Sequence, residues 1–190
     1  MTGAEPIAGW DAVVLAGGRA RRMGSEDKLS LDVGGRSLLS RAVEAVAGAG
    51  RIVIVGPRRA LDTDIDVAWC REQPEGSGPA AALRTGLDRV CAELVVVVAG
   101  DHPFLDASTL ARLVDGVYED GAVAVDSRSQ PQWLCSAWRT AALRTAALAP
   151  NESLRVALGA LRWRPVPVDE RVTVDCDTPE DLRRARELAQ

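Results

Sequence analysis

The chain has very little of several residue types that make common sites. A single histidine and four widely spaced cysteines, with no Cys-x-x-Cys pair, cannot supply a usual zinc-binding set. The cysteines are expected to be reduced and mostly buried, as in a cytoplasmic protein. The net charge of −4 excludes a bulk electrostatic attraction to nucleic acid, so no nucleic-acid partner is expected.

Long apolar segments are also missing. The apolar run 94–99 is far too short to cross a membrane, so no membrane partner is expected. Residues 1–9 lack the basic start and the apolar centre of a signal peptide, and we expect them to be a loose leader. With 190 residues, 47% of them hydrophobic, the chain is expected to form one domain over 1–190 in the cytoplasm. These numbers leave open whether it is a monomer or a homo-oligomer.

Glycine and arginine are concentrated in one segment, Val13–Lys28, which reads VVLAGGRARRMGSEDK. Its apolar start breaks at Gly17-Gly18, and three arginines follow between positions 19 and 22. Glycine lets backbone N–H groups approach an anion closely, and the cations neutralise the charge of that anion. The segment therefore predicts a phosphate-binding loop at the carboxyl end of a first strand.

Two better-known phosphate loops do not fit this segment. The spacing of Gly18, Gly24 and Lys28 differs from G-x-x-x-x-G-K-[ST], and two adjacent glycines differ from G-x-G-x-x-G. Lys28 is the only lysine in a chain whose Lys and Arg residues number 23. A compact, mobile ammonium at this position favours a functional role over a surface lysine retained by accident.

Strands and helices are expected to alternate along the chain, which predicts an α/β fold. The sheet should be mostly parallel with helices on both faces and one antiparallel strand. Ligands of such sheets bind beyond the carboxyl ends of the strands, so the loops after 11–16, 67–70 and 94–99 should meet there. Strands are expected at 11–16, 51–56, 67–70, 94–99, 122–126, 132–139 (antiparallel), 163–168 and 172–175. Helices are expected from a cap at Ser37, at 79–91, from a cap at Asp106 or Ser108, and at 140–149, 153–161 and 179–189.

Two acidic residues are candidates for a metal site. Asp101 ends the central strand, where a carboxylate would face the crevice and hold Mg²⁺ against nucleotide phosphates. Asp177 precedes the last helix and is the candidate for a second contact. The alternatives are that Asp101 caps its turn and that Asp177 stabilises a helix N-terminus. His102, beside Asp101, is expected to be exposed or to play a supporting part.

The order Leu-Ala-Gly-Gly-x-x-x-Arg-Met-Gly-x-x-Asp-Lys at 15–28 resembles the signature of nucleotidyltransferases, most closely the molybdenum cofactor guanylyltransferase family. Gly100-Asp101-x-Pro103 is similar to the metal-binding turn of that family, and the loop 71–78 to its base-reading segment. The resemblance implies a Rossmann-like, GT-A-like fold and transfer of GMP from GTP to molybdopterin. It implies catalytic roles for Arg22, Lys28 and Asp101, a Mg²⁺ site at Asp101 and Asp177, and nucleotide contacts at Leu15, Ala16, Gly17, Gly18, Arg19, Arg22, Lys28, Glu72, Gly78 and Pro79.

Some positions differ from the family pattern. Ala20 replaces the usual serine, Glu72 the usual aspartate, and Ala80-Ala81-Ala82 the usual Leu-Ala-Gly. The Asp-x-Asp at 175–177 is more similar to cytidylyltransferases. Transfer from CTP or to a different phosphorylated acceptor, and a non-catalytic nucleotide-binding protein, therefore remain alternatives. Trp133 and Trp138 are candidate walls for the acceptor.

Overall fold

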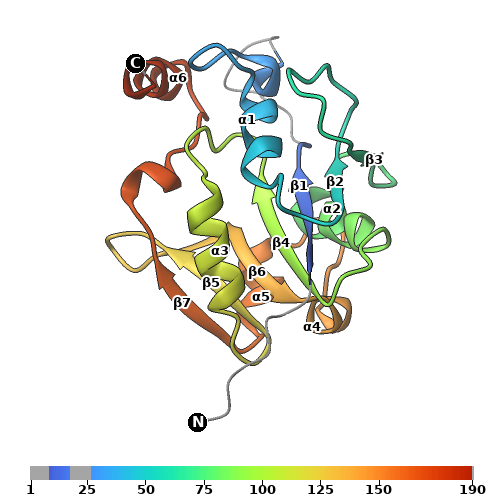
Figure 1. Cartoon of the computed structure of the whole chain (residues 1–190). Coiled ribbons are helices and arrows are strands. Elements are labelled where there is room, and N and C mark those ends of the chain that lie inside the picture. Colours follow the sequence, from blue (N-terminus) through green and yellow to red (C-terminus); the bar gives the residue numbers. More distant parts are fainter. Residues whose placement is uncertain (1–8, 18–26, 190) are drawn as a thin grey trace.

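A five-stranded sheet in the order β3-β2-β1-β4-β6 forms the centre of the computed structural model, which describes residues 9–17 and 27–189. A parallel pair, β5 and β7, continues beside β6, where the Arg139 N–H donates to the Asp120 carbonyl at 2.8 Å (Figure 1). The strands are β1 (Trp10–Leu15), β2 (Ile52–Val55), β3 (Ala68–Cys70), β4 (Leu94–Ala99), β5 (Gly121–Val125), β6 (Pro131–Arg139) and β7 (Trp163–Pro167).

The three inner strands are buried on both faces. Every residue of β2 and β4 is buried, and so are all residues of β1 after Trp10. Strands covered on both faces have continuous apolar runs without alternation, as these do. β1 pairs in parallel with β2 and β4, and β6 runs antiparallel to β4, which confirms the expected mostly parallel sheet with one antiparallel strand.

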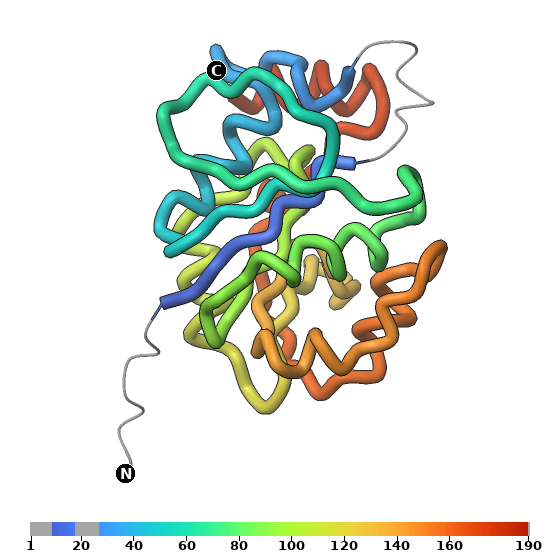
Figure 2. Tube along the Cα trace, turned by 90° about the vertical axis from the view of Figure 1, so that its right-hand side faces the viewer, coloured from blue at the N-terminus to red at the C-terminus, as the bar shows by residue number. Residues whose placement is uncertain are grey.

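Helices cover both faces of the sheet, as expected. Figure 2 shows the strands between one layer made by α1 and α3 and another made by α2, α4 and α5. Helix α6 lies beyond the carboxyl ends of β1 and β4, where Leu182 and Ala185 pack on Val33 and Leu38 (Figure 1). The helices are α1 (Leu38–Ala45), α2 (Gly78–Leu87), α3 (Ala107–Asp115), α4 (Thr140–Thr145), α5 (Leu154–Gly159) and α6 (Pro179–Leu188), with 3₁₀ turns η1 (Lys28–Ser30) and η2 (Glu170–Thr173).

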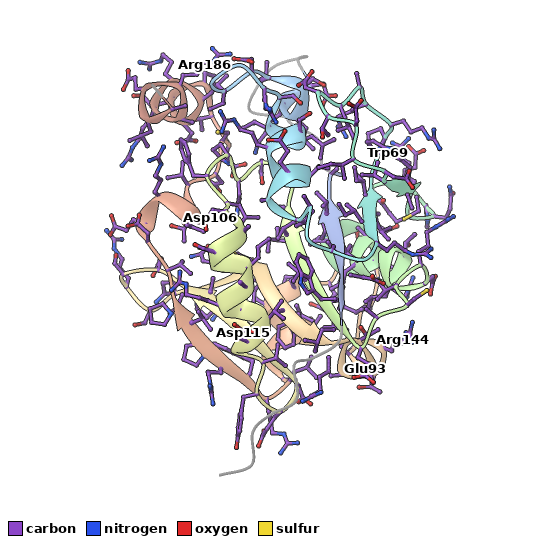
Figure 3. All side chains as sticks on the ribbon, viewed as in Figure 1. Trp69, Glu93, Asp106, Asp115, Arg144 and Arg186 are labelled. Carbon is purple, nitrogen blue, oxygen red and sulfur yellow. The ribbon has the colours of Figure 1, made fainter. Side chains whose placement is uncertain are left out.

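Capping side chains set several helix starts. Ser37 accepts from the N–H of Ser40, and Asp106, not Ser108, caps α3 by accepting from the Thr109 N–H. Figure 3 shows Asp106 at the upper end of α3 and Asp115 at its lower end. Thr178 and Asp181 form the expected capping box of α6. Each of these caps satisfies N–H groups that lack a partner within the helix.

Some expected elements differ from the observed ones. The strand expected at 172–175 is wrong: η2 includes residues 172 and 173, where Asp169 accepts from the Arg171 N–H at 2.8 Å and closes a tight turn, and residues 174 and 175 form no strand. The helix expected at 140–149 ends at Thr145, and the one expected at 79–91 ends at Leu87. Trp138 is fully buried and donates to Ser136 Oγ at 2.8 Å, so it belongs to the core and forms no wall for a substrate.

The four cysteines are free, and two of them, Cys135 and Cys176, are buried. Burial raises the pKa of both thiols to about 12, which leaves them protonated at neutral pH. Across 9–17 and 27–189, the structure contains no helix with both the length and the apolar character that a membrane crossing requires.

The contact of α2 with the sheet generates a stability prediction. A Cβ at Gly86 would lie 2.7 Å from Val13 Cγ1 and 3.0 Å from Val55 Cγ2. Gly86→Ala is therefore expected to lower the free energy of unfolding by about 1–3 kcal/mol, because overpacking exceeds the gain in helix propensity. Denaturant unfolding measures this, with Gly159→Ala as the control, since a Cβ there would meet Trp133 only at 3.8 Å. Equal stability of the two variants would contradict the expectation.

Candidate functional site

The ammonium of Lys28 joins two carboxylates from distant parts of the chain. Its Nζ donates to Asp101 Oδ2 at 2.7 Å and to Asp177 Oδ1 at 2.6 Å. Lys28 begins η1, Asp101 follows β4, and Asp177 precedes α6. The Lys28 side chain is 12% exposed, compared with 22% for Asp101 and 53% for Asp177. Three of the residues predicted from the sequence therefore lie together beyond the carboxyl ends of β1 and β4.

The charges of this cluster stabilise one another. Burial by itself lowers the pKa of Lys28, but Asp101 and Asp177 outweigh burial and leave the pKa of Lys28 above its ordinary value. A third carboxyl, Asp175, lies in the field of the other two, and burial together with that repulsion raises its pKa. At neutral pH the lysine is therefore charged and firmly held by its carboxylate partners.

A pocket of about 350 Å³ opens beside the cluster. It lies between the carboxyl ends of β1 and β4 and the first turn of α2, and Asp101 belongs both to its wall and to the Lys28 cluster. Pockets of this size hold small organic ligands. Its lining residues are Leu15, Gly17, Glu72, Gly76, Gly78, Pro79, Ala82, Ala99, Asp101 and Leu134.

Glu72 brings a buried carboxylate to the wall of the pocket. Its Oε1 accepts from the Gly76 N–H at 3.0 Å, and a Cβ on Gly17 would lie 3.9 Å from that oxygen. Within the described residues, Oε2 is buried and has no hydrogen-bond partner. A buried carboxylate oxygen without a partner is costly, so Oε2 is a site for a donor supplied by a ligand.

The first turn of α2 borders the same pocket. Pro79 occupies its start, and Gly78 has a φ of +88° that glycine adopts at no steric cost. No side chain caps this turn, because the Ser77 hydroxyl donates to the Pro74 carbonyl instead. The N-terminus of α2 therefore presents backbone N–H groups and the positive end of its dipole on the side of the pocket.

The other predicted positions fall in three groups. Leu15, Gly17, Gly78 and Pro79 line the pocket. Ala16 is buried beside it, with its N–H donating to the Val55 carbonyl at 2.8 Å. Gly18, Arg19 and Arg22 lie outside the described residues, so their predicted roles stay predictions.

His102 and Arg59 differ from what the sequence suggested. His102 is 7% exposed, and its Nδ1 has no partner among the described residues, so the expectation of an exposed histidine is wrong, while the alternative of a supporting part beside Asp101 stays a prediction. Arg59 was not predicted, although it donates to the Ala16 carbonyl at 2.9 Å and to Asp27 Oδ2 at 2.6 Å. The Arg58-Arg59 pair has the sequence appearance of an ordinary charged turn, and no motif marks either residue.

The fold has counterparts among solved structures. A solved structure described as a nucleotidyl transferase from Methanothermobacter thermautotroptrophicus matches with a TM-score of 0.79 at 24% identity, over 96% of this chain and 98% of the other. Residues 12–166 match the MobA-like NTP transferase domain, and the chain belongs to this family of enzymes.

Two curated relatives agree with this assignment. The molybdenum cofactor guanylyltransferase of Rhodopseudomonas palustris is 31% identical over 94% of this chain and 91% of its own length. The protein of the same description from Shewanella amazonensis is 30% identical, and there the match spans 59% of each chain.

The single lysine makes its ionisation directly measurable. We expect the Lys28 Cε resonance of lysine-labelled protein to titrate at a pKa above the ordinary lysine value, because two carboxylates favour the ammonium. The stability contributed by this raised pKa is present below the pKa of the unfolded lysine and is lost as pH rises through the folded pKa.

Asp101→Asn tests the cause of that shift. It removes one carboxylate while burial continues to oppose the charge, so the pKa of Lys28 should fall. Asp115→Asn, at the far end of α3 (Figure 3), is the control and should leave the pKa unchanged. A wild-type pKa at or below the ordinary value would contradict the cluster.

Proposed function

We propose that this protein transfers GMP from GTP to the terminal phosphate of molybdopterin and releases pyrophosphate. The observation that carries the proposal is the Lys28 ammonium held between Asp101 and Asp177 at the edge of a ligand-sized pocket. Curated relatives named molybdenum cofactor guanylyltransferase support the choice of donor and acceptor. A cytoplasmic location and the absence of nucleic-acid and membrane partners belong to the same proposal.

The transfer requires positioning and charge stabilisation. An oxygen of the acceptor phosphate attacks the α-phosphorus of GTP in line, the new P–O bond forms, and the bond from the α-phosphorus to the bridging oxygen of pyrophosphate breaks. Lys28 stabilises the negative charge on the phosphates, and Arg22 and backbone N–H groups of the 15–28 loop are proposed to share this role. Electrostatic contacts that are already in place lower the barrier without reorganisation.

Asp101 and Asp177 suit a bound Mg²⁺. Two carboxylates from different segments already converge on one cation, the Lys28 ammonium. Mg²⁺ is commonly held by one or two carboxylates together with substrate phosphates. The described residues contain no cluster of three protein metal ligands, and this mode of binding does not require one. When bound, the ion would neutralise charge on the phosphates.

Glu72 is the proposed contact to guanine or to its ribose. Guanine has two adjacent N–H groups that can donate hydrogen bonds to a carboxylate, whereas cytosine has no such pair of donors. The buried Oε2 lacks a donor within the described residues, and Gly76 holds the other oxygen in place. A contact from Oε2 to guanine would favour GTP over CTP, whereas a contact to the ribose would not discriminate between them.

Two alternatives have specific features in their favour. The Asp-x-Asp at 175–177 resembles cytidylyltransferases, which favours CTP or a different phosphorylated acceptor. Ala20, Glu72 and Ala80-Ala81-Ala82 depart from the family pattern and favour a nucleotide-binding protein without catalysis. Release of pyrophosphate from GTP in the presence of the acceptor tests the non-catalytic alternative, because only a transferase releases it, and comparison of the four nucleotides tests the choice of CTP.

The central experiment follows pyrophosphate release from GTP with molybdopterin and Mg²⁺. Lys28→Ala is expected to lower turnover by roughly 100-fold or more, the scale of losing one preorganised electrostatic contact. Arg183→Ala, on the exposed side of α6, is the control and should retain wild-type turnover. Chelation of Mg²⁺ should also abolish release. Near-normal turnover of Lys28→Ala would remove this residue from the mechanism.

Thermal-shift measurements with GTP, CTP, ATP and UTP test the nucleotide preference. GTP should stabilise the wild type most, since a ligand that binds the folded state stabilises it by RT ln(1 + [L]/Kd), which is larger for the tighter ligand at equal concentration. Glu72→Gln should weaken GTP binding about tenfold, the effect of losing a hydrogen bond to a charged group. Glu75→Gln, in the same loop but 54% exposed, is the control. An unchanged order of the four nucleotides in Glu72→Gln would assign Glu72 to the ribose.

A further inference from the structure

Arg59 attaches to both ends of the segment that the structure does not describe. The side chain is 9% exposed in the turn after β2. Its Nη1 donates to the carbonyls of Ala16 at 2.9 Å and Pro57 at 3.1 Å, and its Nε donates to Asp27 Oδ2 at 2.6 Å. Gly17, next to Ala16, and Asp27 flank residues 18–26, so one guanidinium connects the chain on the two sides of this segment.

The end of β2, just before Arg59, also packs against the backbone at Ala16. A Cβ on Gly56 would lie 2.5 Å from the Ala16 carbonyl oxygen and 3.0 Å from the Gly17 nitrogen, so the end of β2 packs directly on Ala16 and Gly17. The Ala16 N–H also donates to the Val55 carbonyl at 2.8 Å. The position of Gly17 at the pocket wall therefore depends on the end of β2.

The second contact of Arg59, with Asp27, lies next to Lys28 in the chain. Asp27 precedes η1, where its carbonyl accepts from the Ser30 N–H at 3.0 Å and its side chain accepts from the Ser30 hydroxyl. Lys28 is the first residue of η1. The hydrogen bond from Arg59 thus fixes the residue immediately before Lys28, whose Nζ lies 2.7 Å from Asp101 Oδ2.

We propose that Arg59 is a positioning residue for nucleotide transfer: anchored on the Ala16 carbonyl, it holds Asp27 in place, and through Asp27 it holds Lys28 at the carboxylates. This inference rests on the proposed function for its kinetic consequences. Arg59 lies outside the lining of the pocket. Its loss is therefore expected to change turnover more than nucleotide binding.

The guanidinium is suited to this role, because its planar fork donates to a carboxylate and to backbone carbonyls at the same time. Glutamine keeps an amide donor but cannot span these three acceptors. A second anchor keeps η1 folded in such a variant: Leu29 is buried, and a Cβ on Gly100 would lie 3.2 Å from its Cδ1. Arg59→Gln should therefore loosen Lys28 without unfolding the site.

The test compares Arg59→Gln with two matched variants. Arg58→Gln changes the exposed neighbouring arginine. Arg144→Gln removes an arginine that donates to the Val90 carbonyl at 3.0 Å, near Glu93 at the opposite end of the sheet (Figure 3). In Arg59→Gln, kcat should fall 10- to 100-fold while KM for GTP changes less than about threefold, because a small misplacement of a charge-stabilising group mainly affects the reacting state.

A double variant separates positioning from general damage. If Arg59 acts through Lys28, adding Arg59→Gln to Lys28→Ala should lower kcat by less than about twofold further, since the two residues work as a unit. If Arg59 only maintains the fold, Arg59→Gln should lower kcat by the same factor in the Lys28→Ala background as in the wild type. That result would overturn the proposal. A kcat of Arg59→Gln equal to that of Arg58→Gln or Arg144→Gln overturns it as well.

A measurement without catalysis keeps the test independent of the proposed function. Because Lys28 is the only lysine, acetic anhydride modifies one side-chain amine, and mass spectrometry of the proteolysed protein reports its rate. Arg59→Gln should raise this rate about threefold or more relative to both controls, the scale of weakening an ion pair. An unchanged rate overturns the positioning role, whereas a wild-type protein that releases no pyrophosphate overturns the proposed function instead.

Discussion

The contact on which the site depends is the convergence of Asp101 and Asp177 on the Lys28 ammonium. Partly buried charges are expensive to remove from water, and they are tolerated where opposite charges and hydrogen bonds compensate them. Here the compensation requires η1, the end of β4 and the start of α6 to meet at one point. The ion pairs therefore connect the opening loop, the central strand and the C-terminal helix into one structure beyond the sheet.

The parallel sheet explains why these groups meet. β1, β2 and β4 run in the same direction, so their carboxyl ends lie at one edge, and the loops that follow them share the space above it. Each loop contributes a different chemistry. The loop after β1 leads to the lysine, the turn after β2 contributes Arg59, and the turn after β4 contributes the carboxylate. The pocket therefore has the Lys28 cluster beside one part of its wall, at Asp101, and the carboxylate of Glu72 in another part.

The two ends of this pocket differ in how much reorganisation a ligand would require. Glu72 is already held by Gly76 and has a free oxygen, and the first turn of α2 has no competing side-chain cap. The lysine, in contrast, is engaged by two carboxylates before any phosphate arrives. Under the proposed function, the Glu72 end is therefore ready to bind the base, whereas the Lys28 end must exchange internal partners for the phosphates of the substrate.

The sequence by itself determined the fold class, the capped helix starts and the approximate strands, because apolar periodicity and capping chemistry act over a few residues. It also indicated Lys28 and Asp101, since a long motif and a strand-end carboxylate are visible in one dimension. Only the tertiary structure decided that Asp177, 149 positions from Lys28, reaches the same ammonium, that Arg59 joins Ala16 to Asp27, and that His102 is buried. The tertiary structure also has a 3₁₀ turn over Glu170–Thr173, where the sequence predicted the start of a strand at 172–175. Contacts of this kind depend on how distant segments pack, and no local pattern encodes which side chains will then lie within hydrogen-bond distance.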